Sequence, residues 1–534
     1  MFLRGKKENA QLLTSFGEQK DDYFNFPMIE KYFNRKDKSK VFQIISTKTY
    51  HDLDFNEVFA FVDRTHSKVG QQYLYNTLRT PNWDPTKNKL NERIIDKLTN
   101  DNSFRVSIQK SLGTLNKYEA FHIASNFQDD HIAKPKWFFI VPILSLASCA
   151  ISLLCIWKPV FIIALLVVFI INLVVHFWNK RNLSQYIDSL PQLIQLNKVA
   201  EYLFSFTEFK ALNTELSQSI RSIHHVKHRM SFFQLELKLQ GDFQIIAWTL
   251  FELLKTLFLL EPLLLFGAIK RLDTKRAAIE SVFEFVGRID SLISIASLRK
   301  GLDMYCLPQL GKEIHAVEAY HPLIPNCTTN SIHISDKSVL LTGSNMSGKT
   351  SFIRTIGINI IMGFTINTCF ASSFTSPLIK VHTGIRISDD LINNKSYYFE
   401  EVSTIKTMID ESLRPDKNLF LLDEIYKGTN TIERISAGKA VLSILSKNHN
   451  KVLVSTHDIE LTELLKDEYE LFHFSEVIRG KHIDFDYKLK TGKLKNRNAI
   501  RILQMNNYPK MVIKDALITA NKMDSTFNPK EILS

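Results

Sequence analysis

The strongest constraint on the fold of this chain is the short run Val339 to Arg354, VLLTGSNMSGKTSFIR. Its first residues are apolar and predict a buried strand, Gly343 breaks that strand, and a helical pattern begins near Lys349. The spacing Gly-x-x-x-x-Gly-Lys-Thr is that of a phosphate-binding loop, whose backbone N–H groups surround a polyphosphate at a helix N-terminus. The alternative is a glycine-rich turn beside a stray lysine. The flanking strand and helix favour the phosphate-binding loop.

The loop predicts ATP and Mg²⁺ as ligands. We expect the Lys349 ammonium to pair with the β- and γ-phosphates and the Thr350 hydroxyl to bind Mg²⁺. The residues that we predict to contact the nucleotide are Gly343, Ser344, Asn345, Met346, Ser347, Gly348, Lys349, Thr350 and Ser351.

Two further apolar strands end in groups that suit phosphate chemistry. Leu419 to Leu422 precedes Asp423 and Glu424, and the run KVLVS precedes His457. We expect Asp423 to hold Mg²⁺, Glu424 to deprotonate the attacking water, and His457 to lie near the γ-phosphate. Each group alone is more often a surface or packing residue. Together with Lys349 they predict an ATPase that converts ATP and water to ADP and phosphate.

The rest of the chain divides by pattern. From about residue 316, strands alternate with helices, which predicts an α/β P-loop NTPase domain with a largely parallel sheet. Before it, apolar residues fall at helical spacing, for example between Asp52 and Pro81. The predicted domains are a basic N-terminal segment (1–45), a first helical part (46–135), a transmembrane hairpin (136–179), a second helical part (180–315) and the ATPase domain (316–534). The basic N-terminal segment predicts a solvated tail or, alternatively, a nucleic-acid-binding arm.

Two long apolar runs predict the transmembrane hairpin. Trp137 to Trp157 carries no charge, and Val160 to Trp178 contains only Asn172 and His176 as polar residues. About 20 apolar residues cross a bilayer, and the short break between the runs favours a hairpin. The basic residues at the outer ends are Lys134, Lys136, Lys180 and Arg181, which predicts that both soluble parts are cytoplasmic. The alternative is an apolar hairpin buried in a soluble protein.

A third apolar run, Ile245 to Ile269, contains charged residues. Glu252 and Lys255 stand three positions apart, so they can pair on one helix face. We interpret the run as a buried or membrane-facing helix of the helical region, with a third membrane element as the alternative.

Charge and cysteine content limit the partners and the compartment. The formal net charge is +12, which suits an anionic partner such as nucleic acid or an acidic membrane, although basic flanks of membrane segments give the same signal. The five cysteines show no paired or metal-binding spacing, which fits a reducing compartment. The N-terminus lacks the apolar core of a signal peptide.

Several segments resemble the MutS family of mismatch-repair ATPases. GSNMSGKTS resembles the family's GPNMGGKST, DEIYKGTNT resembles DEIGRGTST, and STHDIELTELL resembles ATHYFELTQL. SDDLINNKSYYFEEVS resembles DDLxxGxSTFxxEM, with Ser396 at the family's serine and Glu401 at its glutamate. VDRTHSKVGQQYLYNTLRTP resembles a segment of the family's core domain. The likeness covers roughly residues 50 to 520.

The resemblance implies an ABC-class ATPase domain and an all-α MutS core-like domain. It implies a homodimer that binds two nucleotides at the subunit interface, with Ser396 contacting the γ-phosphate held by the partner subunit. ATP binding would then rearrange the helical core, whose usual output in the family is DNA clamping.

The chain also departs from the family pattern. No segment corresponds to the N-terminal mismatch-reading domain, and Tyr426 and Lys427 replace the family's Gly-Arg. Asn496 to Leu503 lacks the usual Ser-Tyr-Gly, and the hairpin falls near the expected position of a DNA clamp. These departures argue against mismatch recognition and leave the residues for ATP binding in place.

Three functions remain open from the sequence. The first is a membrane-anchored MutS-like ATPase that couples hydrolysis to DNA, either mismatched or branched. The second is a membrane ATPase that acts on a protein or lipid partner without DNA. The third, a transporter, is disfavoured because two spans per chain form a thin pathway and no LSGGQ-type signature is present.

Overall fold

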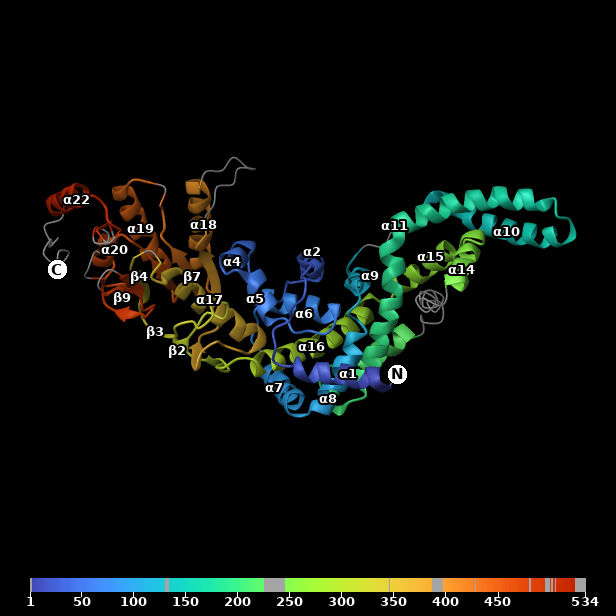
Figure 1. The fold of residues 1–534 in the computed structure, drawn as a ribbon, viewed down its shortest axis with the longest axis horizontal. Coiled ribbons are helices and arrows are strands. Elements are labelled where there is room, and N and C mark those ends of the chain that lie inside the picture. Colours follow the sequence, from blue (N-terminus) through green and yellow to red (C-terminus); the bar gives the residue numbers. More distant parts are fainter. Residues whose placement is uncertain are drawn as a thin grey trace. The chain divides into compact units, whose positions relative to one another are not determined.

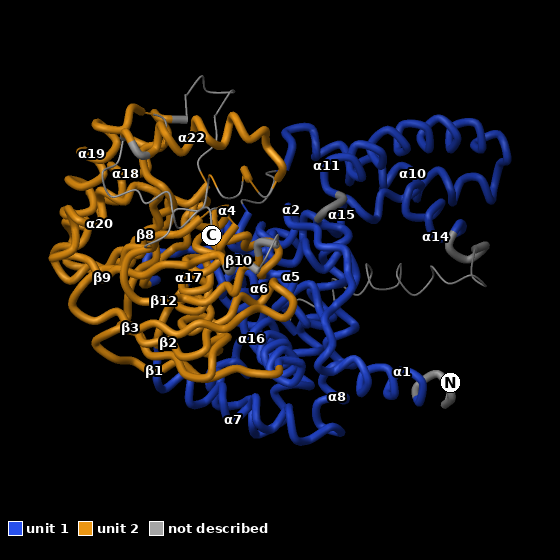
Figure 2. Tube along the Cα trace, turned by 60° about the vertical axis from the view of Figure 1, so that its left-hand side comes forward, with its two compact units in different colours: residues 1–41, 59–80, 84–302 blue, residues 42–58, 81–83, 303–534 orange. Residues whose placement is uncertain are grey.

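The computed structural model describes residues 2–129, 134–224, 245–344, 346–386, 397–427, 429–479, 482–494, 500, 503–504 and 506–523. The chain forms two compact units, drawn in different colours in Figure 2. The first unit comprises residues 1–41, 59–80 and 84–302, and the second comprises residues 42–58, 81–83 and 303–534. The first unit is helical, and the second combines helices with β-sheets.

The helices of the first unit follow the chain as α1 (Phe2–Thr14), α2 (Phe26–Ile29), α3 (Lys31–Arg35), α6 (Lys68–Arg79), α7 (Pro85–Asn100), α8 (Asn102–Gly113), α9 (Ser125–Gln128), α10 (Ile140–Trp157), α11 (Phe161–Phe204), α12 (Thr207–Lys210), α14 (Ile245–Leu257), α15 (Leu260–Asp273) and α16 (Arg276–Lys300). Two short 3₁₀ helices, η1 (Tyr118–Ile123) and η2 (Lys136–Phe139), lie between them, and α5 (Phe55–Val62) is shared between the two units.

The long helix α16 forms the centre of the first unit and packs against α6, α7 and α11 (Figure 1). Its fully buried Asp290 accepts hydrogen bonds from the Ser67 hydroxyl and from the backbone N–H groups of His66 and Ser67, at the N-terminus of α6. Burial raises the pKa of Asp290 to about 6 in spite of these bonds. A Cβ atom at Gly70 would lie 2.1 Å from this carboxylate, so the contact between the two helices requires glycine there.

The N-terminal segment is folded where the sequence predicted a solvated tail. Met28, Ile29, Tyr32 and Phe33, in helices α2 and α3, are buried, and the Tyr32 hydroxyl donates to Glu284 on α16 at 3.0 Å. The prediction is therefore wrong for residues 26–35. The prediction relied on the basic residues of the segment, whereas its apolar and aromatic residues pack against α6 and α16.

Helices α10 and α11 form the hairpin that the two apolar runs predicted (Figure 1). Residues 136–157 and 161–183 form helices that are long and apolar enough to cross a membrane. Only 11% of the most apolar stretch of each helix is buried. Core helices of soluble proteins pass the same test of length and composition, but such helices are mostly buried. The Trp137 and Trp178 rings meet edge to face at 4.7 Å at the open end of the hairpin. Beyond this end, α11 continues through Pro191 into the helical unit.

The third apolar run forms two helices instead of the single helix that we predicted. Helix α14 ends at Leu257, Leu259 adopts a positive φ of 48°, and α15 begins at Leu260. The predicted pairing is present, because the Lys255 Nζ atom lies 2.9 Å from Glu252 Oε1.

The second unit is built around a six-stranded sheet in the order β12-β9-β4-β8-β7-β6. Its strands are β4 (Ser338–Thr342), β6 (Lys380–Gly384), β7 (Asn418–Asp423), β8 (Lys451–Ser455), β9 (Tyr469–His473) and β12 (Lys490–Thr491). All neighbours are parallel except β12, which is an antiparallel edge strand. This arrangement confirms the prediction of a largely parallel sheet.

The remaining strands of this unit are β1 (Gln309–Leu310), β2 (Ile314–Ala319), β3 (Asn330–Ile334) and β5 (Ser373–Ser376), which form a second sheet, and the antiparallel pair β10 (Glu476–Arg479) and β11 (His482–Phe485). The helices are α4 (Thr47–Asp52), α17 (Lys349–Ile366), α18 (Tyr397–Ser412), α19 (Thr431–Leu445), α20 (Ile459–Leu464) and α22 (Lys510–Met523).

The central strands β4, β7 and β8 lie side by side at the core of the large sheet. Nearly all of their residues are buried, which explains why each is a continuous apolar run in the sequence. Since the three strands are parallel, their carboxyl ends meet at one edge of the sheet, where the predicted site residues follow.

Candidate functional site

The loop after β4 has the backbone conformation that its glycines permit. Gly343 and Gly348 have φ values of +150° and +105°, and α17 begins at Lys349. A Cβ atom at Gly343 would lie 2.6 Å from the carbonyl oxygen of Phe474, so this position requires glycine. The Lys349 Nζ atom donates to the carbonyl oxygens of Gly343 and Ser344, both at 2.9 Å. The ammonium group therefore folds back over its own loop.

Burial lowers the pKa of the Lys349 ammonium, and the negative charges of Glu424 and Asp423 act in the opposite direction. In this arrangement the loop's own carbonyl oxygens accept the ammonium hydrogen bonds. Phosphate oxygens would be stronger acceptors, because hydrogen bonds between two charged groups are stronger than those to neutral carbonyls.

Thr350 and Asp423 meet at the carboxyl edge of the sheet. The Thr350 hydroxyl donates to Asp423 Oδ2 at 2.7 Å, and the Ser455 hydroxyl at the end of β8 donates to Asp423 Oδ1. A hydroxyl and a carboxylate are hard oxygen donors, which Mg²⁺ prefers. The donor set therefore fits the predicted metal ion, and Ser455 is a partner of Asp423 that sequence reasoning missed.

Glu424 adopts a positive φ of 52°, and its backbone N–H donates to the Ser455 carbonyl at 3.0 Å. Its carboxylate lies 2.8 Å from His457 Nε2 and 2.9 Å from Lys427 Nζ. Burial alone would raise the pKa of Glu424, but the hydrogen bonds and charges of His457 and Lys427 lower it to about 2. The carboxylate is therefore ionised and already held by two nitrogen groups.

The family's glutamate position, Glu401, supports the loop that carries Glu424. The Glu401 side chain on α18 is fully buried and accepts a hydrogen bond from the backbone N–H of Tyr426, which has a positive φ of 61°. Burial raises the pKa of Glu401. Ser396 and Asn345 lie outside the described residues, so the predictions for them stay predictions.

Two arginines connect residues 42–58 to the rest of the second unit. Arg354 on α17, one turn after Thr350, lies 2.7 Å from Asp54, and Arg386 Nη2 donates to the same carboxylate at 3.0 Å. Asp52 accepts hydrogen bonds from the Thr383 hydroxyl and from the backbone N–H groups of Ile385 and Arg386. These contacts link α17 to the end of β6, and no motif in the sequence indicated them.

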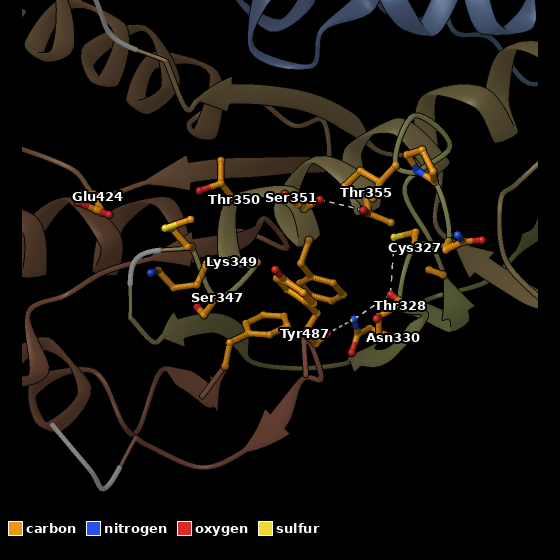
Figure 3. A pocket seen from close by; sticks show the side chains of 18 residues that line it. Cys327, Thr328, Asn330, Ser347, Lys349, Thr350, Ser351, Thr355, Glu424 and Tyr487 are labelled. Atoms are coloured by element: carbon orange, nitrogen blue, oxygen red, sulfur yellow. Dashed lines mark hydrogen bonds between the residues drawn. The ribbon is translucent and has the colours of Figure 1, made fainter. Parts of the chain in front are cut away.

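A cavity of about 450 Å³ lies beside the loop (Figure 3). Lys349, Thr350 and Glu424 lie toward one end of it, and Cys327, Thr328 and Asn330 toward the other (Figure 3). The Asn330 side chain donates to the carbonyl oxygen of Tyr487 at 2.9 Å and accepts from the Leu489 N–H at 2.8 Å. The other predicted loop residues that line the cavity are Met346, Ser347, Gly348 and Ser351.

Sequence reasoning missed the aromatic part of this cavity. Phe474 and Tyr487 both line it, and a Cβ atom at Gly348 would lie 3.3 Å from Tyr487 Cδ1. Each follows a strand without any recognisable spacing to the loop. Ser344, also predicted, donates its hydroxyl hydrogen to Glu476 at 2.9 Å.

Comparison with known proteins finds relatives of the C-terminal part of the chain. Residues 339–524 match the family model of MutS domain V. The chain is 28% identical over 271 residues to the DNA mismatch repair protein MutS of Fusobacterium nucleatum, which covers 46% of this chain and 30% of that protein. It is 27% identical to the MutS proteins of Aquifex pyrophilus, over 46% of this chain and 30% of that protein, and of Listeria innocua, over 48% and 31%. The chain thus spans about 30% of the length of these relatives. The domain match and these similarities show that the C-terminal part of the chain is similar to the MutS family.

Proposed function

We propose that this protein is a membrane-anchored ATPase of the MutS family that hydrolyses ATP with Mg²⁺ at a dimer interface. The observation that carries the proposal is the 2.7 Å contact between Thr350 and Asp423, beside Lys349 and next to the paired carboxylate of Glu424. The domain limits predicted above, with the ATPase domain at 316–534, are part of this proposal.

The residues at the sheet edge divide the chemistry between them. Lys349 would exchange its two carbonyl acceptors for the β- and γ-phosphates, while Thr350 and Asp423 would hold Mg²⁺. When bound, Mg²⁺ neutralises charge on the phosphates. Glu424 would orient the attacking water and accept its proton, and His457 would lie beside the γ-phosphate.

The ion pairs of Glu424 define a resting state. A carboxylate with a pKa of about 2 is a weak base, and both of its oxygens are occupied by Lys427 and His457. Release of either contact would return the pKa toward its ordinary value and open an oxygen for water. We infer that ATP, by drawing one of these nitrogen groups to its γ-phosphate, activates the base.

The cavity beside the loop suits the nucleoside part of ATP. Its volume of about 450 Å³ is in the range of small-molecule sites, and the rings of Phe474 and Tyr487 offer apolar faces to a base. Asn330 and Thr328 add hydrogen-bonding groups at the end away from Lys349. The second nucleotide contact, from Ser396 of the other subunit, rests on the family resemblance.

The exposure of the α10–α11 hairpin supports membrane anchoring. Leu146, Ile156 and Trp157 expose 75%, 78% and 87% of their surface, whereas the core helix of a soluble protein would bury such residues. A bilayer would cover this surface. With the basic residues at the open end, the hairpin would place the ATPase unit in the cytoplasm.

DNA is the proposed partner of the ATP cycle. The net charge of +12 supports an anionic partner, and the similar proteins are DNA mismatch repair proteins. The hairpin favours the alternative, in which the same cycle acts on a protein or lipid partner at the membrane without DNA.

ATP hydrolysis by the detergent-solubilised full chain separates these functions. The rate is measured with and without Mg²⁺, and with duplex, mismatched and branched DNA across a salt series. Stimulation that fades with rising salt supports coupling to DNA. Mg²⁺-dependent hydrolysis that no DNA changes supports the membrane-partner alternative. If no Mg²⁺-dependent hydrolysis is found, the ATPase proposal is wrong.

A further inference from the structure

The turn between α14 and α15 is bound by polar side chains from within the two apolar helices of the hairpin. The Ser145 hydroxyl on α10 donates to the carbonyl oxygen of Phe258 at 2.7 Å. Asn172 on α11 donates to the carbonyl oxygen of Leu257 at 2.6 Å and to the Ser148 hydroxyl at 3.0 Å. The carbonyls at the end of α14 have no partner within their own helix, so the hairpin supplies one.

These contacts fix the depth of the turn along the hairpin. Asn172 lies about 12 Å along α11 from Lys180, at about 1.5 Å per residue. Lys180 and Lys136 mark the basic open end of the hairpin. The hydrocarbon layer of a bilayer is about 30 Å thick. If the open end lies at the membrane surface, the turn at Leu259 lies inside the nearer leaflet.

Three charged residues beside the turn, Glu252 and Lys255 on α14 and Glu261 on α15, are paired and lie near the open end of the hairpin. The Lys255 ammonium lies 2.9 Å from Glu252 and 3.3 Å from Glu261. Glu261 also accepts from Asn179 at 2.7 Å, and Lys180 lies 3.8 Å from Glu252. Lys255 and Glu261 have no exposed surface. This mutual pairing, near the level of Asn179 and Lys180, lowers the cost of placing charge beside the hydrocarbon layer.

One face of α14 remains apolar and exposed. Leu250, Leu253 and Leu254 lie on the same side of the helix by their spacing, and each exposes about half of its surface, from 48% to 56%. Figures 1 and 2 both show α14 beside the hairpin, against which it packs. The exposed leucines therefore extend the apolar surface of α10 and α11. Acyl chains that cover the hairpin would cover them as well.

We propose that α14 and α15 form a re-entrant hairpin that enters the nearer leaflet and returns without crossing it. The partner of its exposed face is the acyl-chain region of that leaflet. The inference rests on the proposed membrane anchoring of α10 and α11. It has a mechanical consequence, because α16 follows α15 directly and forms the centre of the helical unit. The membrane would thereby hold the central helix at its N-terminal end.

Photo-crosslinking of the full chain in phospholipid liposomes tests the inference. A benzophenone side chain is introduced by codon suppression at Leu254 on α14, at Ile163 on the hairpin, or at Leu13 on α1, an exposed leucine of the same unit. Irradiation is followed by mass measurement of the intact protein. We expect a covalent phospholipid adduct at Leu254 and at Ile163, and none at Leu13.

Comparison of the three positions distinguishes failure of the re-entrant hairpin from failure of the membrane anchor. An adduct at Ile163 without one at Leu254 would overturn the re-entrant hairpin and leave the anchor in place. Absence of an adduct at Ile163 would overturn the membrane anchor itself. Because a benzophenone could disturb packing, the unmodified chain is also irradiated in liposomes whose acyl chains carry a diazirine. Labelling of the peptide with residues 250–254 is then required, and its absence beside a labelled hairpin contradicts the inference.

Discussion

The Thr350 hydroxyl on α17 donates a 2.7 Å hydrogen bond to the Asp423 carboxylate at the end of β7. The two residues come from motifs far apart in the sequence, and the parallel arrangement of β4, β8 and β7 brings them together. This contact joins the start of α17, after the predicted phosphate-binding loop, to the carboxylate that ends β7.

Replacement of Lys349 by alanine is expected to weaken ATP binding by about 100-fold. The ammonium would contribute charge-assisted hydrogen bonds to the phosphates, each worth about 1.5–3 kcal/mol. Binding of a fluorescent ATP analogue to the purified chain measures the loss. The matched control is Lys337→Ala, since Lys337 precedes β4 and donates to the Lys466 carbonyl, outside the site. Equal affinity of the Lys349 variant and the control would contradict the assignment.

Replacement of Thr350 by valine is expected to remove most of the Mg²⁺ dependence of ATP binding. Valine keeps the shape of the side chain but has no oxygen ligand for the metal. The measurement is a Mg²⁺ titration of ATP affinity. Thr365→Val is the control, because Thr365 lies at the other end of α17 and its hydroxyl donates to the Ile361 carbonyl. If the Thr350 variant responds to Mg²⁺ as the control does, the metal site lies elsewhere.

Replacement of Lys427 by methionine is expected to raise the pKa of Glu424. In the intact chain this pKa is about 2, so the basic carboxylate form persists at any pH where the protein works. Loss of the cation 2.9 Å away favours the protonated form, so the acidic limb of the pH–rate profile moves to higher pH. Hydrolysis rates from pH 4 to 8 measure this movement. Lys439→Met, which removes a cation 3.7 Å from Glu468, should leave the profile unchanged.

Replacement of Lys255 by methionine is expected to destabilise the helical unit by about 3–5 kcal/mol, because it leaves the fully buried Glu261 without the cation that pairs with it. A shift of roughly 10 °C in thermal unfolding corresponds to this energy. Arg276→Met is the control, since its ion pair with Asp273 is largely exposed and should cost less than about 1 kcal/mol. If both variants lose the same amount of melting temperature, the ion pairs of Lys255 stabilise the helical unit no more than an exposed ion pair does.

The sequence predicted best where the fold follows from local pattern. Strands β4, β7 and β8 agree within a residue with the predicted runs, since strands of a covered parallel sheet are continuously apolar. The loop glycines, Asp423 and Glu424 were singled out because they stand at the spacings of a phosphate-binding motif. Because β4, β8 and β7 are parallel neighbours, these residues then lie at the same edge of the sheet.

Long-range contacts escaped prediction for a physical reason. Tyr487 reaches the cavity through a hydrogen bond with Asn330, which is separated from it by 157 positions, and no local pattern encodes such a pairing. The same holds for Asp54 and its arginine partners, and for the burial of Tyr32 in a basic segment. Leu259 turns the chain at a positive φ without the glycine that would have signalled it.

In the proposed function, Glu424 activates water for ATP hydrolysis at this site. The most direct test compares single-turnover hydrolysis by the reconstituted full chain with that of the Glu424→Gln variant, while bound ATP and released phosphate are both measured. Both proteins are expected to bind ATP with Mg²⁺ to a similar extent. Phosphate release by the variant is expected to be at least about 100-fold slower, because its amide cannot accept the proton. Hydrolysis by the variant at the rate of the unmodified chain would show that Glu424 is not the base.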